Sequence, residues 1–196
     1  MSSEETDRFY AGHASEYAAA GSHRDNRWRD AFLSGLAPAA AILELGCGGG
    51  YDSAAMIARG FSVTPTDGVA EMAEQAQKRL GVPVQVLRFD AIDYVSAFDG
   101  IWASACLLHV PRADLPAVLQ RIHAALKPGG LFYASFKAGE GEGQDSLSRY
   151  YNYPDTVWLR EAYAVASWAS VEIEEMDGLA YDKRPTRWLH VFARAA

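Results

Sequence analysis

The chain has 196 residues, of which 49% are hydrophobic and 22% are charged, and its formal net charge is −7 at pH 7. These values are typical of one soluble globular domain that is large enough to bury a layered core. The negative charge argues against a nucleic-acid partner, because phosphate binding requires a basic surface. No apolar run approaches the ~20 residues that span a bilayer, so we expect no membrane association.

Two features bear on where the protein resides. The stretch from Met1 to Thr6 is acidic and polar, which is unlike a signal peptide. The two cysteines, Cys47 and Cys106, form no disulfide framework. We therefore expect a cytoplasmic protein, while the oligomeric state is left open.

The N-terminal residues predict helices. Residues 7–17 carry aromatic side chains at positions 9, 10 and 17 and predict one or two short helical pieces on a surface. Residues 25–36 predict a helix with an apolar stripe that includes Trp28 and Phe32. A basic cluster there, Arg24, Arg27 and Arg29, is interrupted by acids and is interpreted as a solvated helix face rather than a phosphate site.

The middle of the chain alternates between strand and helix patterns. Strands are predicted at 41–45, 61–66, 84–89, 99–104 and 130–136, with helices beginning at 52 and spanning 69–80 and 115–126. Such alternation with short connections predicts an α/β fold, in which a parallel sheet carries helices on both faces.

The last third departs from this rhythm. Residues 139–145 predict a flexible loop of glycines and acids, and residues 154–167 predict a helix. Two late strands, near 169–174 and 187–194, are separated only by a loop at 177–186. Strands joined in this way predict an antiparallel hairpin appended to the parallel sheet.

A glycine-rich turn after the first predicted strand is the chemical centre of the sequence. Gly46, Gly48, Gly49 and Gly50 follow that strand and precede a helix, a geometry that lets a ligand approach the backbone closely. Glu44, just before the turn, is a buried acid that needs a partner.

Two acids end the next two predicted strands. Asp67 follows the second strand and Asp90 follows the third, at the edge of the sheet where ligands bind in open α/β folds. Asp67 also lies about 20 residues beyond the glycines, the separation at which an acid accepts hydrogen bonds from a ribose. Each acid alone could equally be a helix N-cap. Together they predict a bound nucleoside.

The glycine pattern argues against a dinucleotide. Tyr51 and Ser53 occupy the places where a G-x-G-x-x-G motif would need its last glycine. Glu44 and Asp52 flank the turn with negative charge, which would repel a pyrophosphate and attract a cation. S-adenosylmethionine joins a nucleoside to a sulfonium and carries no phosphate, so it suits the turn better. A nicotinamide-dependent oxidoreductase is the less favoured alternative.

The motifs resemble those of class I S-adenosylmethionine-dependent methyltransferases, including small-molecule and tellurite-resistance-like members. The resemblance rests on five motifs that occur in family order: Glu44 to Gly50, Asp67 to Met72, Phe89 to Ala91, Phe98 to Ala105 and Leu126 to Gly130. It implies a Rossmann-like, doubly wound, seven-stranded sheet that is mostly parallel, with an antiparallel C-terminal hairpin. Gly68 departs from the small polar residue that is common at its position.

The resemblance also implies a set of cofactor-binding residues. The methionine end would lie over the glycine turn, Asp67 would bind the ribose, and Asp90 with the Ala91 backbone would contact the adenine. Asp52 could point at the cofactor or cap the following helix. The implied set is Tyr17, Glu44, Gly46, Cys47, Gly48, Gly50, Asp52, Asp67, Gly68, Met72, Asp90, Ala91 and Ser104.

Methyl transfer needs a general base only when the acceptor is a protonated oxygen or nitrogen. His109, just past the fourth strand, is the candidate base, although an orienting role is the main alternative. The acceptor is expected to be a small molecule near Tyr10, Arg149, Tyr150 and Tyr153, and Arg149 could instead pair with an acid of the 139–145 loop. No metal is expected.

We expect a single domain over residues 1–196, divided into a helical lid (1–38), a cofactor-binding core (39–137) and an acceptor-side region with the hairpin (138–196). Neither the acceptor nor the methylated atom follows from the sequence. A non-catalytic module that binds S-adenosylmethionine is a second alternative, because a cofactor site does not prove turnover.

Overall fold

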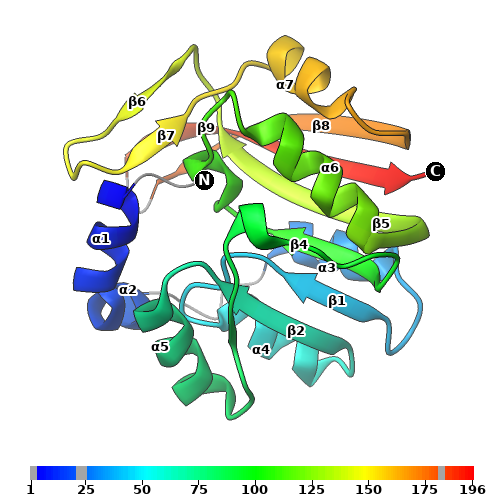
Figure 1. The fold of residues 1–196 in the computed structure, drawn as a ribbon, viewed down its shortest axis with the longest axis horizontal. Helices are drawn as coiled ribbons and strands as arrows, with labels where there is room; N and C mark the ends of the chain where they lie inside the picture. The colour runs from blue at the N-terminus through cyan, green and yellow to red at the C-terminus, as the bar shows by residue number, and fades with distance from the viewer. Residues whose placement is uncertain (1–3, 21–25, 181–183) are drawn as a thin grey trace.

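The computed structural model describes residues 4–20, 26–180 and 184–196. Its main sheet has seven strands in the order β3-β2-β1-β4-β5-β9-β8 (Figure 1). The first five run parallel, β9 pairs antiparallel with β5, and β8 pairs antiparallel with β9. The predicted Rossmann-like, doubly wound fold with an antiparallel C-terminal hairpin is therefore confirmed.

The parallel part alternates strand and helix as predicted. Its strands are β1 (Ala41–Glu44), β2 (Ser62–Asp67), β3 (Gln85–Val86), β4 (Phe98–Ala103) and β5 (Leu126–Lys137), and its helices are α4 (Tyr51–Ala58), α5 (Ala70–Leu80) and α6 (Leu115–Ala125). The third strand is shorter than predicted, because β3 pairs with β2 through only two residues before the chain turns into a 3-10 segment, Phe89–Ala91. The fifth strand begins earlier than predicted, at Leu126.

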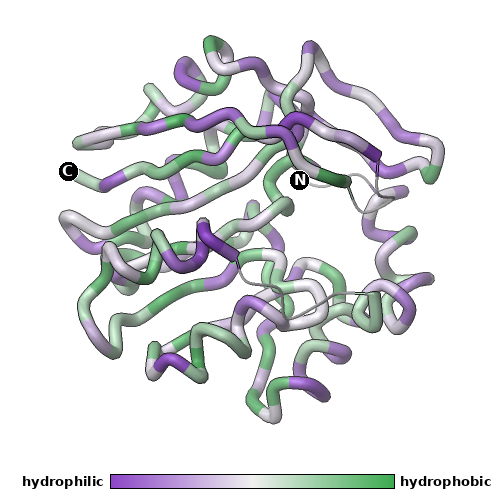
Figure 2. The backbone as a smooth tube through the Cα atoms, turned by 180° about the vertical axis from the view of Figure 1, so that it is seen from behind, coloured by the Kyte–Doolittle hydropathy of each residue, from purple (hydrophilic) through white to green (hydrophobic). Residues whose placement is uncertain are grey.

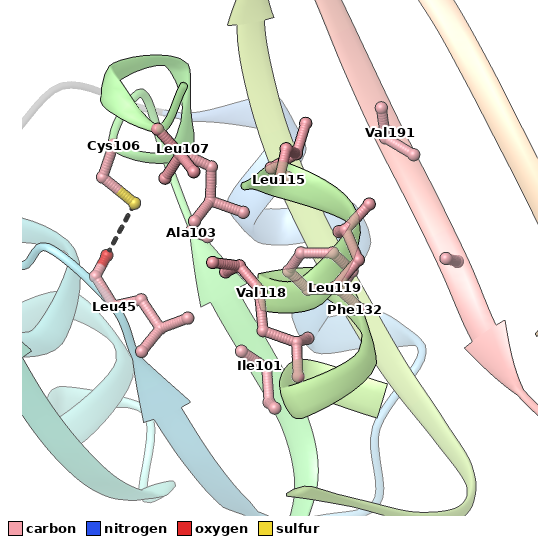
Figure 3. Close-up of a cluster of buried hydrophobic side chains, with 14 of the residues drawn as sticks. Leu45, Ile101, Ala103, Cys106, Leu107, Leu115, Val118, Leu119, Phe132 and Val191 are labelled. Atoms are coloured by element: carbon pink, nitrogen blue, oxygen red, sulfur yellow. Dashed lines mark hydrogen bonds between the residues drawn. The ribbon is translucent and has the colours of Figure 1, made fainter. Parts of the chain in front are cut away.

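Helices cover both faces of the sheet. Viewed as in Figure 1, α6 and α7 (Thr156–Tyr163) lie in front, and α3 (Arg27–Ser34) and α4 lie behind. The front layer holds because α6 carries buried apolar residues at helical spacing, such as Leu115, Val118 and Leu119, which pack toward the sheet (Figure 3). Behind the sheet, Phe32 of α3 packs with Trp102 and Tyr133.

The N-terminal segment forms α1 (Glu4–Gly12) and α2 (Ala14–Ala20), which both contact α5. In Figure 1 these helices lie beside the edge at which the parallel strands end. The prediction of short helical pieces is confirmed. That they form a lid over the cofactor stays a prediction.

The C-terminal region contains more strand than predicted. Within the predicted loop 139–145, β6 (Glu142–Gln144) pairs with β7 (Tyr150–Asn152), so that prediction was wrong for residues 142–144. Glycines and acids disfavour strands, but the buried Tyr151 of β7 fixes the partner strand against the core.

The hairpin strands, β8 (Trp168–Leu179) and β9 (Pro185–Ala195), extend into the predicted loop 177–186, of which residues 181–183 lie outside the described part. Figure 2 views the hairpin from the α3 side. Within the described residues, no helix is both long and apolar enough to cross a membrane.

Candidate active site

The glycine turn lies at the carboxyl end of β1 and is held against its neighbours. The Cys47 amide donates to the carbonyl of Thr66 in β2 at 2.8 Å. Gly46 has φ +62°, and a Cβ there would lie 2.5 Å from the Cβ of Cys106, which donates through Sγ to the carbonyl of Leu45 (Figure 3). Only glycine therefore fits at position 46, and the turn presents bare backbone to the cavity above it.

Asp67 ends β2 with its carboxylate oriented by two backbone donors. Oδ2 accepts from the amide of Gly48 at 2.9 Å, and Oδ1 accepts from the amide of Val69 at 3.0 Å. Burial raises the pKa of Asp67 to about 6, although both hydrogen bonds act in the opposite direction. The N-cap of α5 is Val69, so the N-cap alternative does not describe Asp67. Its bonds instead tie the turn to the second strand.

Glu44 has the partner that its burial requires. Its Oε2 accepts from the hydroxyl of Ser53, and burial holds its pKa well above the usual range. Asp52 has two side-chain partners, since Oδ1 accepts from Arg29 Nη1 at 2.8 Å and Oδ2 accepts from the indole of Trp102 at 3.0 Å. Of its two predicted roles, the N-cap of α4 was wrong, because Gly50 holds that place.

These contacts correct two predictions. Arg29 is buried rather than solvated, because it pairs with Asp52; Arg27 is exposed, and Arg24 lies outside the described residues. The acids at the turn are also less negative than the sequence suggests, since one is buried with a raised pKa and the other is neutralised. The negative charge that would attract a cationic ligand to the turn is therefore smaller than the sequence indicated.

A two-lobed cavity opens above the carboxyl ends of the strands. Both lobes reach Tyr17, Gly46, Gly48, Ser104 and Ala105, which we call the junction. The first lobe lies over β2 and α5, and its further walls include Thr6, Asp7, Tyr10, Asp67, Met72, Phe89 and His109. The second lobe lies between the glycine turn, α3 and the hairpin, and its further walls include Trp28, Glu44, Asp52, Tyr133, Trp188 and His190.

Most of the predicted cofactor residues lie around this cavity. Those that line one or both lobes are Tyr17, Glu44, Gly46, Cys47, Gly48, Asp52, Asp67, Gly68, Met72 and Ser104. Gly50, Asp90 and Ala91 are not among the lining residues: Gly50 caps α4, and the other two are exposed. Asp90 lies 3.6 Å from the guanidinium of Arg88, and its neighbour Phe89 lines the first lobe instead.

Two lining residues on α1 carried no motif in the sequence. Thr6 accepts from the amide of Tyr150 at 2.8 Å, and Asp7 pairs with Arg88 at 2.7 Å. Both contacts join residues far apart in the chain, so only the fold reveals them. They hold α1 over the first lobe.

His109 is buried with both ring nitrogens engaged. Nδ1 lies 2.6 Å from the carbonyl oxygen of Tyr150, to which it donates, and Nε2 lies 3.0 Å from the hydroxyl of Tyr10. This arrangement fixes the tautomer, with Nε2 accepting from Tyr10. Burial lowers the pKa of His109 to about 4, so the ring is neutral at pH 7.

The residues predicted for the acceptor fall into two groups. Tyr10 lines the first lobe, whereas Arg149, Tyr150 and Tyr153 are not among the residues that line either lobe. Arg149 is buried and pairs at 2.7 Å with Asp145, an acid of the 139–145 loop, which is one of its two predicted pairings. The hydroxyl of Tyr150 donates to Glu142, at the β6–β7 hairpin.

Known proteins are similar to this chain in sequence. Residues 42–130 match the model of a family described as "Methyltransferase domain". The ubiquinone biosynthesis O-methyltransferase of Xanthomonas campestris pv. campestris (strain B100) is 29% identical over 164 residues, which cover 74% of this chain and 68% of that protein.

Solved structures extend the likeness to nearly the whole chain. The 1,6-didemethyltoxoflavin-N1-methyltransferase of Burkholderia thailandensis, with bound 1,6-didemethyltoxoflavin and S-adenosylhomocysteine, has a TM-score of 0.79 at 23% identity, covering 98% of this chain and 88% of that one. A phosphoethanolamine N-methyltransferase 2 of Haemonchus contortus, with S-adenosyl-L-methionine, has a TM-score of 0.76 at 17% identity, covering 98% of this chain and 60% of that one. At these identities the likeness concerns the fold.

The cavity suits the cofactor of this family. Gly46 leaves the backbone bare, and Met72 supplies an apolar wall. The carboxylate of Asp67 is fixed by backbone donors, and Asp67 lies about 20 residues beyond the glycines, the sequence separation of an acid that binds a ribose. Fold, motifs and relatives agree, which decides against the oxidoreductase alternative. The family model, the relatives and the fold together support a class I S-adenosylmethionine-dependent methyltransferase, which uses S-adenosylmethionine as its cofactor.

Proposed function

We propose that this enzyme methylates a small-molecule acceptor, which is positioned by Tyr10 and His109. The observation that carries the proposal is the hydrogen bond of 3.0 Å between these residues in the wall of the first lobe. α1 and α2 contribute walls of the cavity, so the acceptor must fit a recess rather than an open surface. Relatives named for ubiquinone biosynthesis and for 1,6-didemethyltoxoflavin support a small acceptor.

We assign the nucleoside end of the cofactor to the first lobe. Asp67 would accept from the ribose hydroxyls, while Met72 and Phe89 would wall the adenine in the place that the sequence assigned to Asp90 and Ala91. The glycine turn and Ser104 would hold the amino-acid end. When bound, the cofactor supplies an electrophilic methyl group, so the protein mainly aligns the acceptor and excludes water.

His109 acts on the acceptor through Tyr10 in this proposal. Its Nε2 already accepts a hydrogen bond from Tyr10, so it does not face the acceptor as a free base. The carbonyl of Tyr150 keeps Nδ1 protonated, which keeps Nε2 an acceptor and fixes the Tyr10 hydroxyl. His109 is thus a positioning residue, and an acceptor proton could reach it only by way of Tyr10. The predicted role of His109 as a general base is therefore limited to a proton that passes through Tyr10.

Release of S-adenosylhomocysteine over a panel of acceptors tests the function. With an active acceptor, Tyr10→Phe and His109→Ala should each lower kcat about 10-fold or more, and the double variant should be no worse than either single one. S-adenosylhomocysteine affinity should not change, and His109→Gln, which retains an acceptor group, should recover part of kcat. Tyr94→Phe is the matched control, because Tyr94 bonds Gln85 away from the cavity.

If the losses of kcat in Tyr10→Phe and His109→Ala add up in the double variant, the proposed pairing of Tyr10 with His109 is contradicted. Cofactor binding without turnover of any acceptor would favour the non-catalytic module.

A further inference from the structure

The second lobe has an aromatic far end that the proposed cofactor site does not use. Three strands, β5, β9 and β8, meet there in fixed register, with Ser135 opposite His190 and Met176 opposite Trp188. Trp28, from the first turn of α3, stacks on the ring of His190 with centroids 3.9 Å apart and planes 14° apart. Figure 2 views this side of the hairpin.

Gly178 shapes this end of the lobe. A Cβ at position 178 would lie 3.0 Å from Cδ1 of Trp188, so the indole packs where a side chain would otherwise stand. Trp188 is only half-buried and lines the lobe, as does Met176. The indole of Trp188 and the thioether of Met176 form the walls together with Trp28, whose ring stacks on His190 and carries the guanidinium of Arg27 at 4.2 Å. An indole and a thioether favour flat apolar ligands.

The charges around the lobe are compensated. Among its described lining residues, Arg27 pairs with Glu174 at 2.7 Å and Asp52 pairs with Arg29 at 2.8 Å. Glu44, which also lines the lobe, accepts from Ser53, and burial holds its pKa well above the usual range. Burial lowers the pKa of His190 to about 4, which leaves its ring neutral at pH 7. A charged ligand would lose its hydration there without gaining an unpaired countercharge, so the far end favours an uncharged one.

One buried polar atom has no protein partner. His190 is 7% exposed, its Nδ1 lies 2.7 Å from the hydroxyl of Tyr133, and its Nε2 pairs with no group in the described part of the chain. Buried polar groups are seldom left unpaired in native proteins. An oxygen or nitrogen of a ligand would complete this wall.

We propose that the far end of the second lobe, formed by Trp28, Met176, Trp188 and His190, binds the ring of a planar, uncharged aromatic acceptor. A substituent of that ring would then reach through the junction toward Tyr10 in the first lobe, where the proposed function positions the acceptor. This inference rests on the proposed function, and it moves the acceptor away from Arg149, Tyr150 and Tyr153.

Binding of 2-naphthol, measured by equilibrium dialysis with S-adenosylhomocysteine present, tests the site without requiring turnover. Decahydro-2-naphthol, which is saturated and not planar, and the 2-naphthoate anion should each bind about 10-fold more weakly than 2-naphthol. Trp188→Ala and Trp28→Ala should weaken 2-naphthol by a similar factor while leaving the affinity for S-adenosylhomocysteine unchanged. Trp158→Ala, on the other side of the sheet, is the control for loss of an indole.

Met176→Glu is a second test of the site in case the tryptophan variants misfold. It introduces a charge into the lobe at a half-buried position. It should also weaken 2-naphthol, with an unchanged melting temperature. Equal binding of 2-naphthol to the wild type and to folded variants of Trp28, Trp188 and Met176 would overturn the site, as would equal binding of the saturated analogue. If these variants lose 2-naphthol but no acceptor releases S-adenosylhomocysteine, the proposed function fails and the site stands.

Discussion

Asp67 makes cofactor affinity depend on pH, with a sign that the structure fixes. Burial raises its pKa to about 6 in the free protein, and ribose hydroxyls would donate to the ionised form. About ten-elevenths of the carboxyl groups are ionised at pH 7 and about one-eleventh at pH 5. The Kd for S-adenosylhomocysteine should therefore rise about 10-fold, or ~1.4 kcal/mol, from pH 7 to pH 5.

The stability of the free protein should change in the opposite direction. The folded-state pKa of Asp67 lies above the ordinary value of about 3.9, so the native state binds more protons than the unfolded state between these values. Ionisation of Asp67 then costs about 3 kcal/mol of folding free energy as the pH rises from about 4 through 6. Glu44, whose pKa is also raised, contributes with the same sign.

Isothermal titration with S-adenosylhomocysteine between pH 5 and pH 7 measures the affinity, and denaturant unfolding measures the stability. Asp67→Asn is the control for titration of the ligand itself, and it should bind weakly with no 10-fold pH dependence. Glu44→Gln should keep the pH dependence. An affinity that is independent of pH in the wild type, or an equal slope in Asp67→Asn, would refute this account of the ribose site.

Three further predictions concern the turn, the buried ion pair and the lid. Gly46→Ala should destabilise the protein by about 3 kcal/mol or more, because its Cβ would lie 2.5 Å from the Cβ of Cys106. Gly81→Ala is the control, because Gly81 has a similar φ and its Cβ would meet no atom within 4 Å, and it should cost about 1 kcal/mol. Equal urea midpoints for the two variants would contradict this prediction.

Arg29→Met should cost about 3–5 kcal/mol, since it leaves a partly buried carboxylate unpaired, whereas Arg27→Met at an exposed pair should cost less than about 1 kcal/mol in the same assay. Removing residues 1–20 should weaken S-adenosylhomocysteine binding at least ~10-fold through loss of the α1 wall. An unchanged affinity in calorimetry would contradict the prediction of a lid.

The fold could be predicted from the sequence because its signals are local. The strand at 41–45, the glycines after it and the helix at 115–126 each carry a period or turn signal that specifies one element. The β6–β7 pair could not be predicted, because its glycines and acids disfavour strands and only the packing of Tyr151 fixes it.

The site was predictable where motif and topology coincide. Asp67 and Gly46 lie on the cavity because the ends of parallel strands share one edge of a sheet. The contacts of Asp52 with Arg29 and of His109 with Tyr10 join distant segments, and no spacing in the sequence announces them. The second lobe depends likewise on the register of the hairpin against β5.

Transfer of a deuterated methyl group tests the central claim most directly. The enzyme is incubated with S-adenosylmethionine labelled on its methyl group and with a panel of small acceptors that includes 2-naphthol and related hydroxyarenes. The masses of the products are then measured by mass spectrometry. We predict that one or more acceptors gain the labelled methyl group, that S-adenosylhomocysteine forms in equal amount, and that Tyr10→Phe slows both. Tight binding of the cofactor with no labelled product from any acceptor would contradict methyl transfer and leave a binding module.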